Sequence, residues 1–210
     1  MFGVEVILRY LVPGFLVVLP LLRVVPGGGM SGFTGVDAAL AGVAVLVAGY
    51  AVHQLYWLLF NLFRVYESPQ RRPLQVVRAR LEAIGIDAPT RSRLWEEWEL
   101  WTYRVADDPY RERATRLWLF VHSSAGVVLA AVLGIMGITA ASALGLASFG
   151  PRFWLLYILT AVLFAALTIQ NWRYVNWWEG IVADRLFSPV PKAILTDGAG
   201  PTGRLRTPVV

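Results

Sequence analysis

Residues 117–147 read LWLFVHSSAGVVLAAVLGIMGITAASALGLA and contain no Asp, Glu, Lys or Arg. A helix rises 1.5 Å per residue, so about 20 apolar residues cross the roughly 30 Å hydrocarbon core of a bilayer. The stretch is therefore long and apolar enough to be a transmembrane helix. It is also rich in Gly, Ala and Ser, the small residues that let membrane helices pack closely.

Three further apolar stretches have the length of a membrane span. They run from about Phe2 to Leu22, from Val36 to Phe63, and from Arg152 to about Gln170, after which aromatic residues indicate that the helix continues toward Phe187. A tight turn at Phe149-Gly150-Pro151 separates the last two spans.

The first span is expected to be a retained helix rather than a cleaved signal peptide. Glu5 lies where a signal peptide has its positive region, and no small-x-small cleavage motif follows the apolar run. Pro13 and Pro20 lie within this span and predict a kink.

Length and composition agree with a membrane protein. Of 210 residues, 57% are hydrophobic and 16% are charged, and the mean hydropathy is +0.56, whereas a globular protein has about 25% charged residues. We predict an all-α integral membrane protein with four transmembrane helices. The chain has no cysteine, which excludes disulfides, thiolate metal sites and cysteine nucleophiles.

The segment between the second and third spans has the composition of a soluble helical insert. Pro73 suits a first helical position and Gly85 a C-terminal cap, which predicts one helix. Thr90 or Asp87 can cap a second helix, and Asp108-Pro109 predicts a third that continues into the membrane. The predicted divisions are 1–66 with the first two spans, 67–110 as the insert, 111–187 with the last two spans and their extensions, and 188–210 as a disordered tail.

Arginine and lysine are distributed unequally between the two sides of this arrangement. The outer connections carry Arg23 and Arg152, whereas most other basic residues lie in the insert and the C-terminal region. Because positively charged loops stay in the cytoplasm, we predict a cytoplasmic insert and an N-in, C-in topology. The net charge of +5 then indicates contact with anionic lipid rather than nucleic acid. We expect a multi-pass protein of a prokaryotic cytoplasmic membrane.

Several polar side chains fall at the cytoplasmic level of the predicted spans. Ionisable groups inside a membrane cost about 2.5 to 3.5 kcal/mol on translocon scales and usually face protein or water. The candidate intramembrane polar cluster comprises Glu5, Arg9, His53, Gln54, Asn61, His122, Ser123, Gln170 and Asn171.

The two histidines of this cluster leave three interpretations open. His53 and His122 could line a proton or ion path, form a two-histidine metal pair, or bond to neighbouring carbonyls. A closed metal site would also need a carboxylate, for which Glu5 is the candidate, but Glu5 can pair with Arg9 one turn away. We expect interhelical hydrogen bonding, with no metal and no cofactor.

Small residues recur every four positions in the third span. Gly126, Ala130 and Gly134 form one such series, and Gly137, Ala141 and Gly145 form another. Series of this kind serve close helix packing, either inside one bundle or between subunits. We expect a homo-oligomer with this helix at the subunit contact, because four helices are too few to enclose a wide channel.

The insert combines basic and aromatic residues. Such a surface can bind single-stranded nucleic acid, anionic lipid or a protein partner. We favour lipid, with a small core made by the tryptophans. The candidate surface comprises Arg71, Arg72, Arg78, Arg80, Arg91, Arg93, Trp95, Trp98 and Trp101.

One residue pair resembles a catalytic motif. Arg116 and His122 are separated by five residues, which resembles the Arg-x4-6-His motif of HEPN-type ribonucleases. That resemblance would imply RNA cleavage, but His122 lies in a predicted membrane helix that RNA does not easily reach. Walker, GxSxG and HExxH motifs are absent from the sequence, and we expect no enzyme.

The leading functional hypothesis is an oligomeric membrane protein, either a gated pore or a membrane-acting effector, controlled through its cytoplasmic helices. One alternative is a small proton-linked transporter or transport subunit that uses His53, His122 and Glu5. Another is a membrane anchor or scaffold for a cytoplasmic complex, since the architecture resembles that of accessory proteins in prokaryotic antiviral defence.

Overall fold

The computed structural model describes residues 6–24, 35–68, 70–86, 89–105 and 108–187, and these residues form helices and short connections without a strand. Glu5 and the predicted tail, 188–210, lie outside the described residues. The elements are η1 (Ile7–Leu11), α2 (Val12–Val24), α3 (Gly35–Leu62), η3 (Val65–Glu67), α4 (Arg72–Ala83), α5 (Arg91–Val105), α6 (Asp108–Ala143) and α7 (Pro151–Phe187).

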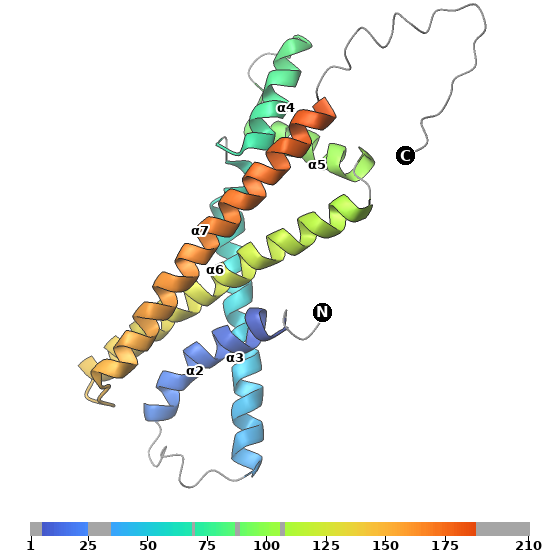
Figure 1. Cartoon of the computed structure of the whole chain (residues 1–210). Coiled ribbons are helices and arrows are strands. Elements are labelled where there is room, and N and C mark those ends of the chain that lie inside the picture. Colours follow the sequence, from blue (N-terminus) through green and yellow to red (C-terminus); the bar gives the residue numbers. More distant parts are fainter. Residues whose placement is uncertain (1–5, 25–34, 69, 87–88, 106–107, 188–210) are drawn as a thin grey trace, which may run out of the picture.

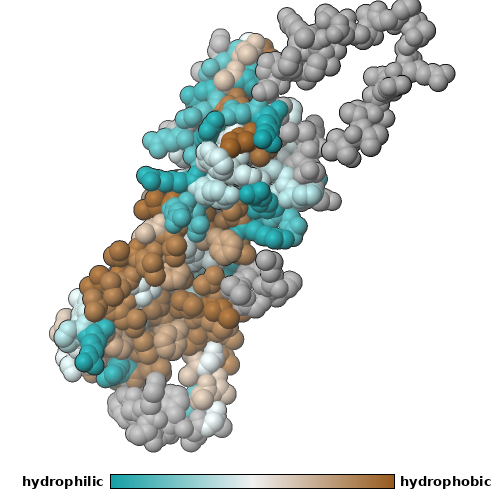
Figure 2. Space-filling model, viewed as in Figure 1, coloured by the Kyte–Doolittle hydropathy of each residue, from teal (hydrophilic) through white to brown (hydrophobic). Residues whose placement is uncertain are grey.

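Four helical stretches are long and apolar enough to cross a membrane, which confirms this part of the predicted fold. They cover Ile7–Val24, Asp37–Glu67, Pro109–Ala143 and Pro151–Arg185. Figure 2 shows their hydrophobic surface as one broad region, with most of the hydrophilic surface at the end where α4 and α5 lie and a smaller hydrophilic patch at the opposite end. This distribution suits a chain that lies partly in a bilayer.

The long helix α6 is the centre of the four apolar helices. It forms a hairpin with α7, and the two helices separate toward the end that carries α4 and α5 (Figure 1). Its buried residues Val127, Ala130 and Ile138 pack against Leu16 of α2 and Tyr157 of α7. The helix starts at Asp108 and runs without interruption to Ala143, so it links the α4–α5 end directly to the far end of the molecule.

The first apolar helix is irregular at the position of its first proline. The segment Ile7–Leu11 is π-helical and precedes Pro13. Proline lacks an N–H, so a wider turn before it is a common accommodation. The second proline, Pro20, lies inside α2 without ending it.

Two glycines let this helix touch the backbone of α3. A Cβ added at Gly14 would collide with the Val45 carbonyl, and one added at Gly49 would collide with the Tyr10 carbonyl. Any side chain larger than hydrogen would therefore force α2 and α3 apart.

The N-terminal half of α3 stands away from α6 and α7 (Figure 1). Leu40, Val43 and Val47 are exposed there, and Gly42 has no neighbour within 4 Å of an added Cβ. Leu155, Leu159 and Leu163 of α7 are exposed as well. Exposed apolar surface of this extent needs lipid or other protein to cover it.

The insert folds as two helices after a sharp turn. Arg64 has a left-handed backbone (φ 45°) and turns the chain from α3 into η3. Helix α4 carries Pro73 in its first turn and ends before Gly85 (φ 86°), and Thr90 Oγ1 accepts a hydrogen bond from the Arg93 N–H at the start of α5. These ends confirm the predicted roles of Pro73, Gly85 and Thr90, whereas Asp87, the alternative cap, lies outside the described residues.

The apolar core of the insert includes a residue from α7. Leu74, Val77, Leu81, Leu94 and Trp98 form a buried cluster together with Ala183. Because Ala183 contributes to this cluster, α4 and α5 are not a separate module but are packed on the extension of α7.

Candidate functional site

The N-terminus of α4 is attached to α7 by polar contacts. The Arg72 N–H donates to Asn176 Oδ1 at 2.9 Å, and the Arg72 guanidinium pairs with Asp184 at 2.7 Å. Gly180 of α7 lies directly against the Arg72 side chain. Asn176 of α7 therefore caps the N-terminus of α4. Usually the residue that directly precedes a helix supplies this cap.

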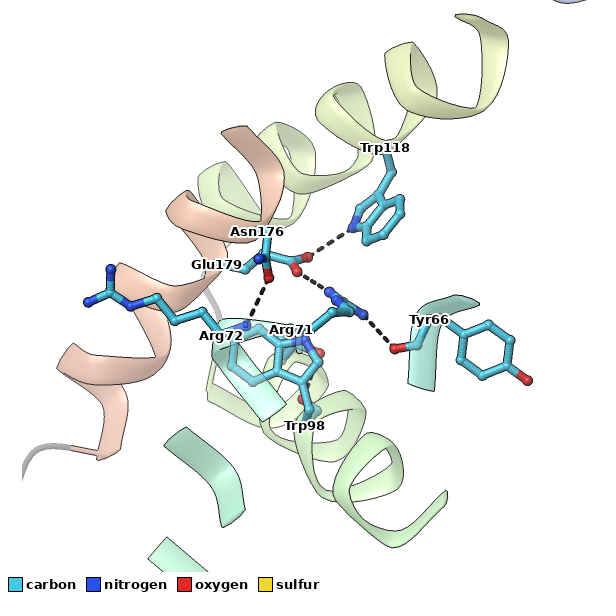
Figure 3. Close-up of polar contacts among 8 residues, drawn as sticks. Tyr66, Arg71, Arg72, Trp98, Trp118, Asn176 and Glu179 are labelled. Atoms are coloured by element: carbon cyan, nitrogen blue, oxygen red, sulfur yellow. Dashed lines mark hydrogen bonds and ion pairs between the residues drawn. The ribbon is translucent and has the colours of Figure 1, made fainter. Parts of the chain in front are cut away.

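The preceding residue, Arg71, makes a buried ion pair (Figure 3). Arg71 is 2% exposed and Glu179 is 4% exposed, and the two side chains are hydrogen-bonded. Arg71 also donates to the Tyr66 carbonyl at 3.0 Å, and the Trp118 indole N–H donates to the other Glu179 oxygen at 2.9 Å. The two charges are therefore matched and hydrogen-bonded, as buried charges must be.

Three tryptophans surround the Arg71 guanidinium. Its Cζ lies 5.2 Å from the ring centroid of Trp95, 5.1 Å from that of Trp118 and 5.9 Å from that of Trp172. A cation over an indole face is stabilised by the ring quadrupole. The rings come from α5, α6 and α7, so Arg71 joins the insert to both long helices.

This arrangement corrects the predicted basic and aromatic surface of the insert. Arg71 is buried and pairs with Glu179, so it does not belong to an exposed surface. The burial of Trp98 in the insert core agrees with the predicted tryptophan core. Trp95 and Trp101 are half-buried, whereas Arg72, Arg78, Arg80 and Arg93 are exposed. The side chain of Arg91 does not belong to the part of the chain that the structure describes.

Both histidines have hydrogen-bond partners. His53 Nε2 accepts from the Trp57 indole N–H at 3.0 Å, and His122 Nδ1 lies 2.9 Å from the Tyr56 hydroxyl. The His122 ring also stacks on Trp118. Within the described residues, no group of three or more His, Cys, Asp or Glu side chains is placed to hold a metal ion.

The other members of the predicted polar cluster do not all meet. Gln54, Asn61 and Gln170 are exposed, Arg9 and Asn171 are half-buried, and Ser123 is buried. Ser123 Oγ has no hydrogen-bond partner among the described residues. The structure therefore groups His53, His122 and Ser123 inside the protein and leaves the three exposed members at its surface.

Two adjacent cavities lie beside the buried ion pair. The first cavity has a volume of about 400 Å³ and is lined by Trp57, Phe60, Asn61, Tyr66, Glu67, Trp95, Glu96, Trp118 and His122. The second cavity, about 950 Å³, lies between α5 and α6, and its lining includes Arg9, Tyr110, Ser123 and Glu179. Trp57, Trp95, Trp118 and His122 line both cavities.

The small residues of α6 have several different neighbours. Ala130 is fully buried, and a Cβ at Gly134 would collide with the Tyr157 ring. An added Cβ at Gly126 or Gly137 meets nothing within 4 Å. The other two members are Ala141, which is buried, and Gly145, which follows the helix with φ 67° and is its C-terminal cap.

Arg116 and His122 each contact a different residue. Arg116 pairs with Glu112 one turn away, and His122 bonds to Tyr56.

The sequence-based candidates omitted several residues of this site, including Glu67, Asn176 and Glu179. A usable signal existed for Glu179, since it is a carboxylate within the otherwise aromatic continuation of the last span. No known protein family, curated protein or solved structure matches this chain.

Proposed function

We propose that this chain is a membrane effector controlled from the cytoplasm. It would cross the membrane four times with both termini and the insert in the cytoplasm. Binding of a ligand or partner at the insert would then change the packing of α6 and α7. The concentration of arginine at the insert end supports this orientation.

The observation that carries the proposal is the buried Arg71–Glu179 pair. It connects the start of α4 to α7, and Trp118 of α6 bonds to the same carboxylate. A displacement of the insert would therefore break contacts with both long helices at once. Because α6 and α7 run unbroken toward the other end of the molecule, the displacement would be carried through the membrane.

Assembly into a homo-oligomeric pore is part of the proposal. The exposed apolar surfaces of α3 and α7 leave room for subunit contacts. Ala130 and Gly134 of α6 are already used inside the protomer, so the subunit contact would involve α3 or α7 more than this face of α6.

The topology is tested with single cysteines, which the natural chain lacks. Arg80→Cys places one on α4 and Ser148→Cys places one in the turn before α7, both at exposed positions. A membrane-impermeant maleimide should label Ser148→Cys from outside the cell and Arg80→Cys only after permeabilisation. The reverse pattern would contradict the proposed orientation.

The effector activity is tested by light scattering and by ion flux from liposomes. We expect a detergent-solubilised particle of several copies and a flux that Glu179→Gln alters, because this change breaks the link between insert and α7. Asp184→Asn, which disturbs the exposed pair with Arg72, is the matched control and should leave the flux unchanged. A monomer with no flux above protein-free liposomes would favour the anchor or scaffold alternative.

A further inference from the structure

The first cavity is an open cleft lined by aromatic rings and by acidic side chains. Its lining aromatic residues are Trp57, Phe60, Tyr66, Trp95 and Trp118. Two charged side chains line it, Glu67 and Glu96, and both are carboxylates. The lining thus combines ring faces with negative charge, the two features that stabilise a positive charge at one place.

The Glu67 carboxylate is nearly buried and weakly matched. Glu67 is 8% exposed, and the one ion-pair partner that the described residues give it is Arg64, at 3.5 Å. The Arg64 side chain is 65% exposed, so solvent screens its attraction. A buried carboxylate with so little compensation is stabilised by any cation that enters the cavity.

Arg71 shows that these rings suit a cation and does not neutralise Glu67. Its guanidinium lies over the rings of Trp95 and Trp118, which both line the first cavity. Its charge is matched by Glu179, and among the described residues the ion-pair partner of Glu67 is Arg64 rather than Arg71. The negative charge of Glu67 therefore remains for a second cation.

The walls favour an organic cation over a metal ion. Alkali and alkaline-earth ions require several oxygen ligands at close range, whereas five aromatic side chains dominate this lining. Alkylammonium groups are held by ring faces and a single counter-ion. The volume of about 400 Å³ falls within the usual range for small-molecule sites.

We propose that the first cavity binds an organic ammonium cation, with Glu67 as its counter-ion and the surrounding aromatic rings as its walls. The inference rests on the proposed function in one respect, since it names the chemical class of the ligand that would control the effector. His122 lines both cavities, so a bound cation would lie beside the contacts that join α3 to α6.

The test compares two probes of equal shape on the full chain in a non-ionic detergent. Choline carries a quaternary ammonium, and 3,3-dimethylbutan-1-ol replaces that nitrogen by carbon. Quenching of tryptophan fluorescence should report choline binding, with the neutral probe weaker by about tenfold or more. Equal affinity for the two probes, or no binding of choline, would overturn the proposal.

Variants locate the binding in the cavity. Glu67→Gln keeps the size of the side chain and removes its charge, so choline affinity should fall by about tenfold or more. Glu82→Gln changes an exposed carboxylate on α4 and should bind choline as the natural chain does. Unchanged affinity in a folded Glu67→Gln protein would contradict the assignment, and the two-probe comparison decides the question if that variant does not fold.

The outcomes separate this inference from the proposed function. Choline binding in detergent together with an absence of liposome flux would support the site and contradict the effector. A flux altered by Glu179→Gln without any choline binding would support the effector and contradict the site.

Discussion

The Tyr157 hydroxyl donates a 2.6 Å hydrogen bond to the backbone carbonyl of Leu16. In a regular helix this carbonyl would accept from the N–H four residues later, but that residue is Pro20, which has none. A side chain of α7 therefore supplies the donor that α2 lacks. The contact explains how a proline lies inside a buried part of an apolar helix, where an unpaired carbonyl is costly.

Removing this donor should destabilise the helix bundle. In Tyr157→Phe the ring remains and the Leu16 carbonyl loses its partner, so we expect a loss of about 1 kcal/mol, typical of a buried hydrogen bond. Chemical unfolding in detergent measures the loss. Tyr50→Phe, at an exposed position, is the control, and equal stability of the two variants would contradict this role of Tyr157.

The close approach of the Tyr157 ring requires glycine at position 134. An added methyl group would overlap the ring and approach the Leu16 carbonyl, so Gly134→Ala should cost about 1 to 3 kcal/mol through overpacking. Gly137→Ala is the matched control because its new Cβ meets nothing within 4 Å. The thermal unfolding temperature in detergent should fall for the first variant, and a similar fall for both would refute the packing argument.

The close contact between η1 and α3 depends on Gly49 in the same way. Its added Cβ would collide with the Tyr10 carbonyl, and backbone cannot move aside as a flexible side chain can. Gly49→Ala should therefore reduce folded yield and unfolding temperature, while Gly42→Ala on the exposed part of α3 should not. Size-exclusion chromatography with a thermal ramp checks both variants, and a fully stable Gly49→Ala protein would show that the helices can separate.

Breaking the buried Arg71–Glu179 pair should be far more costly than breaking its exposed neighbour. Glu179→Gln leaves the Arg71 charge buried without its counter-ion, which typically costs about 3 to 5 kcal/mol. Asp184→Asn breaks the Arg72–Asp184 pair, whose side chains are nearly half exposed, and exposed pairs contribute about 0 to 1 kcal/mol. Unfolding free energies of the two variants give the comparison, and equal values would mean that solvent reaches Arg71.

The helix ends could be predicted because local chemistry decides them. Thr90 bonds to the third residue that follows it, Gly85 adopts a positive φ at the end of α4, and Pro151 starts α7. Each of these features depends on a few consecutive residues. The four-residue spacing of small residues had placed Gly145 on a packing face, but in the structure it has φ 67° in the turn after α6.

The candidate site was predicted less well than the fold. The predicted surface of the insert included Arg71, which the structure buries, whereas the burial of Trp98 agrees with the predicted tryptophan core. Charge and composition indicated that basic and aromatic residues are abundant in the insert, but not which of them face Glu179 or the core. The candidate intramembrane polar cluster did include His53, His122 and Ser123, which are buried. Their predicted depth in the membrane, however, did not show which side of its helix each residue occupies.

The sequence by itself determined four apolar helices and the caps of the helices between them, because hydropathy and capping act over a turn or a single helix. Only the tertiary structure decided that Tyr157 satisfies Leu16, 141 residues earlier, and that Glu179 pairs with Arg71 across 108 residues. Such contacts depend on how the helices pack, and the burial that makes them necessary exists only after the helices have met.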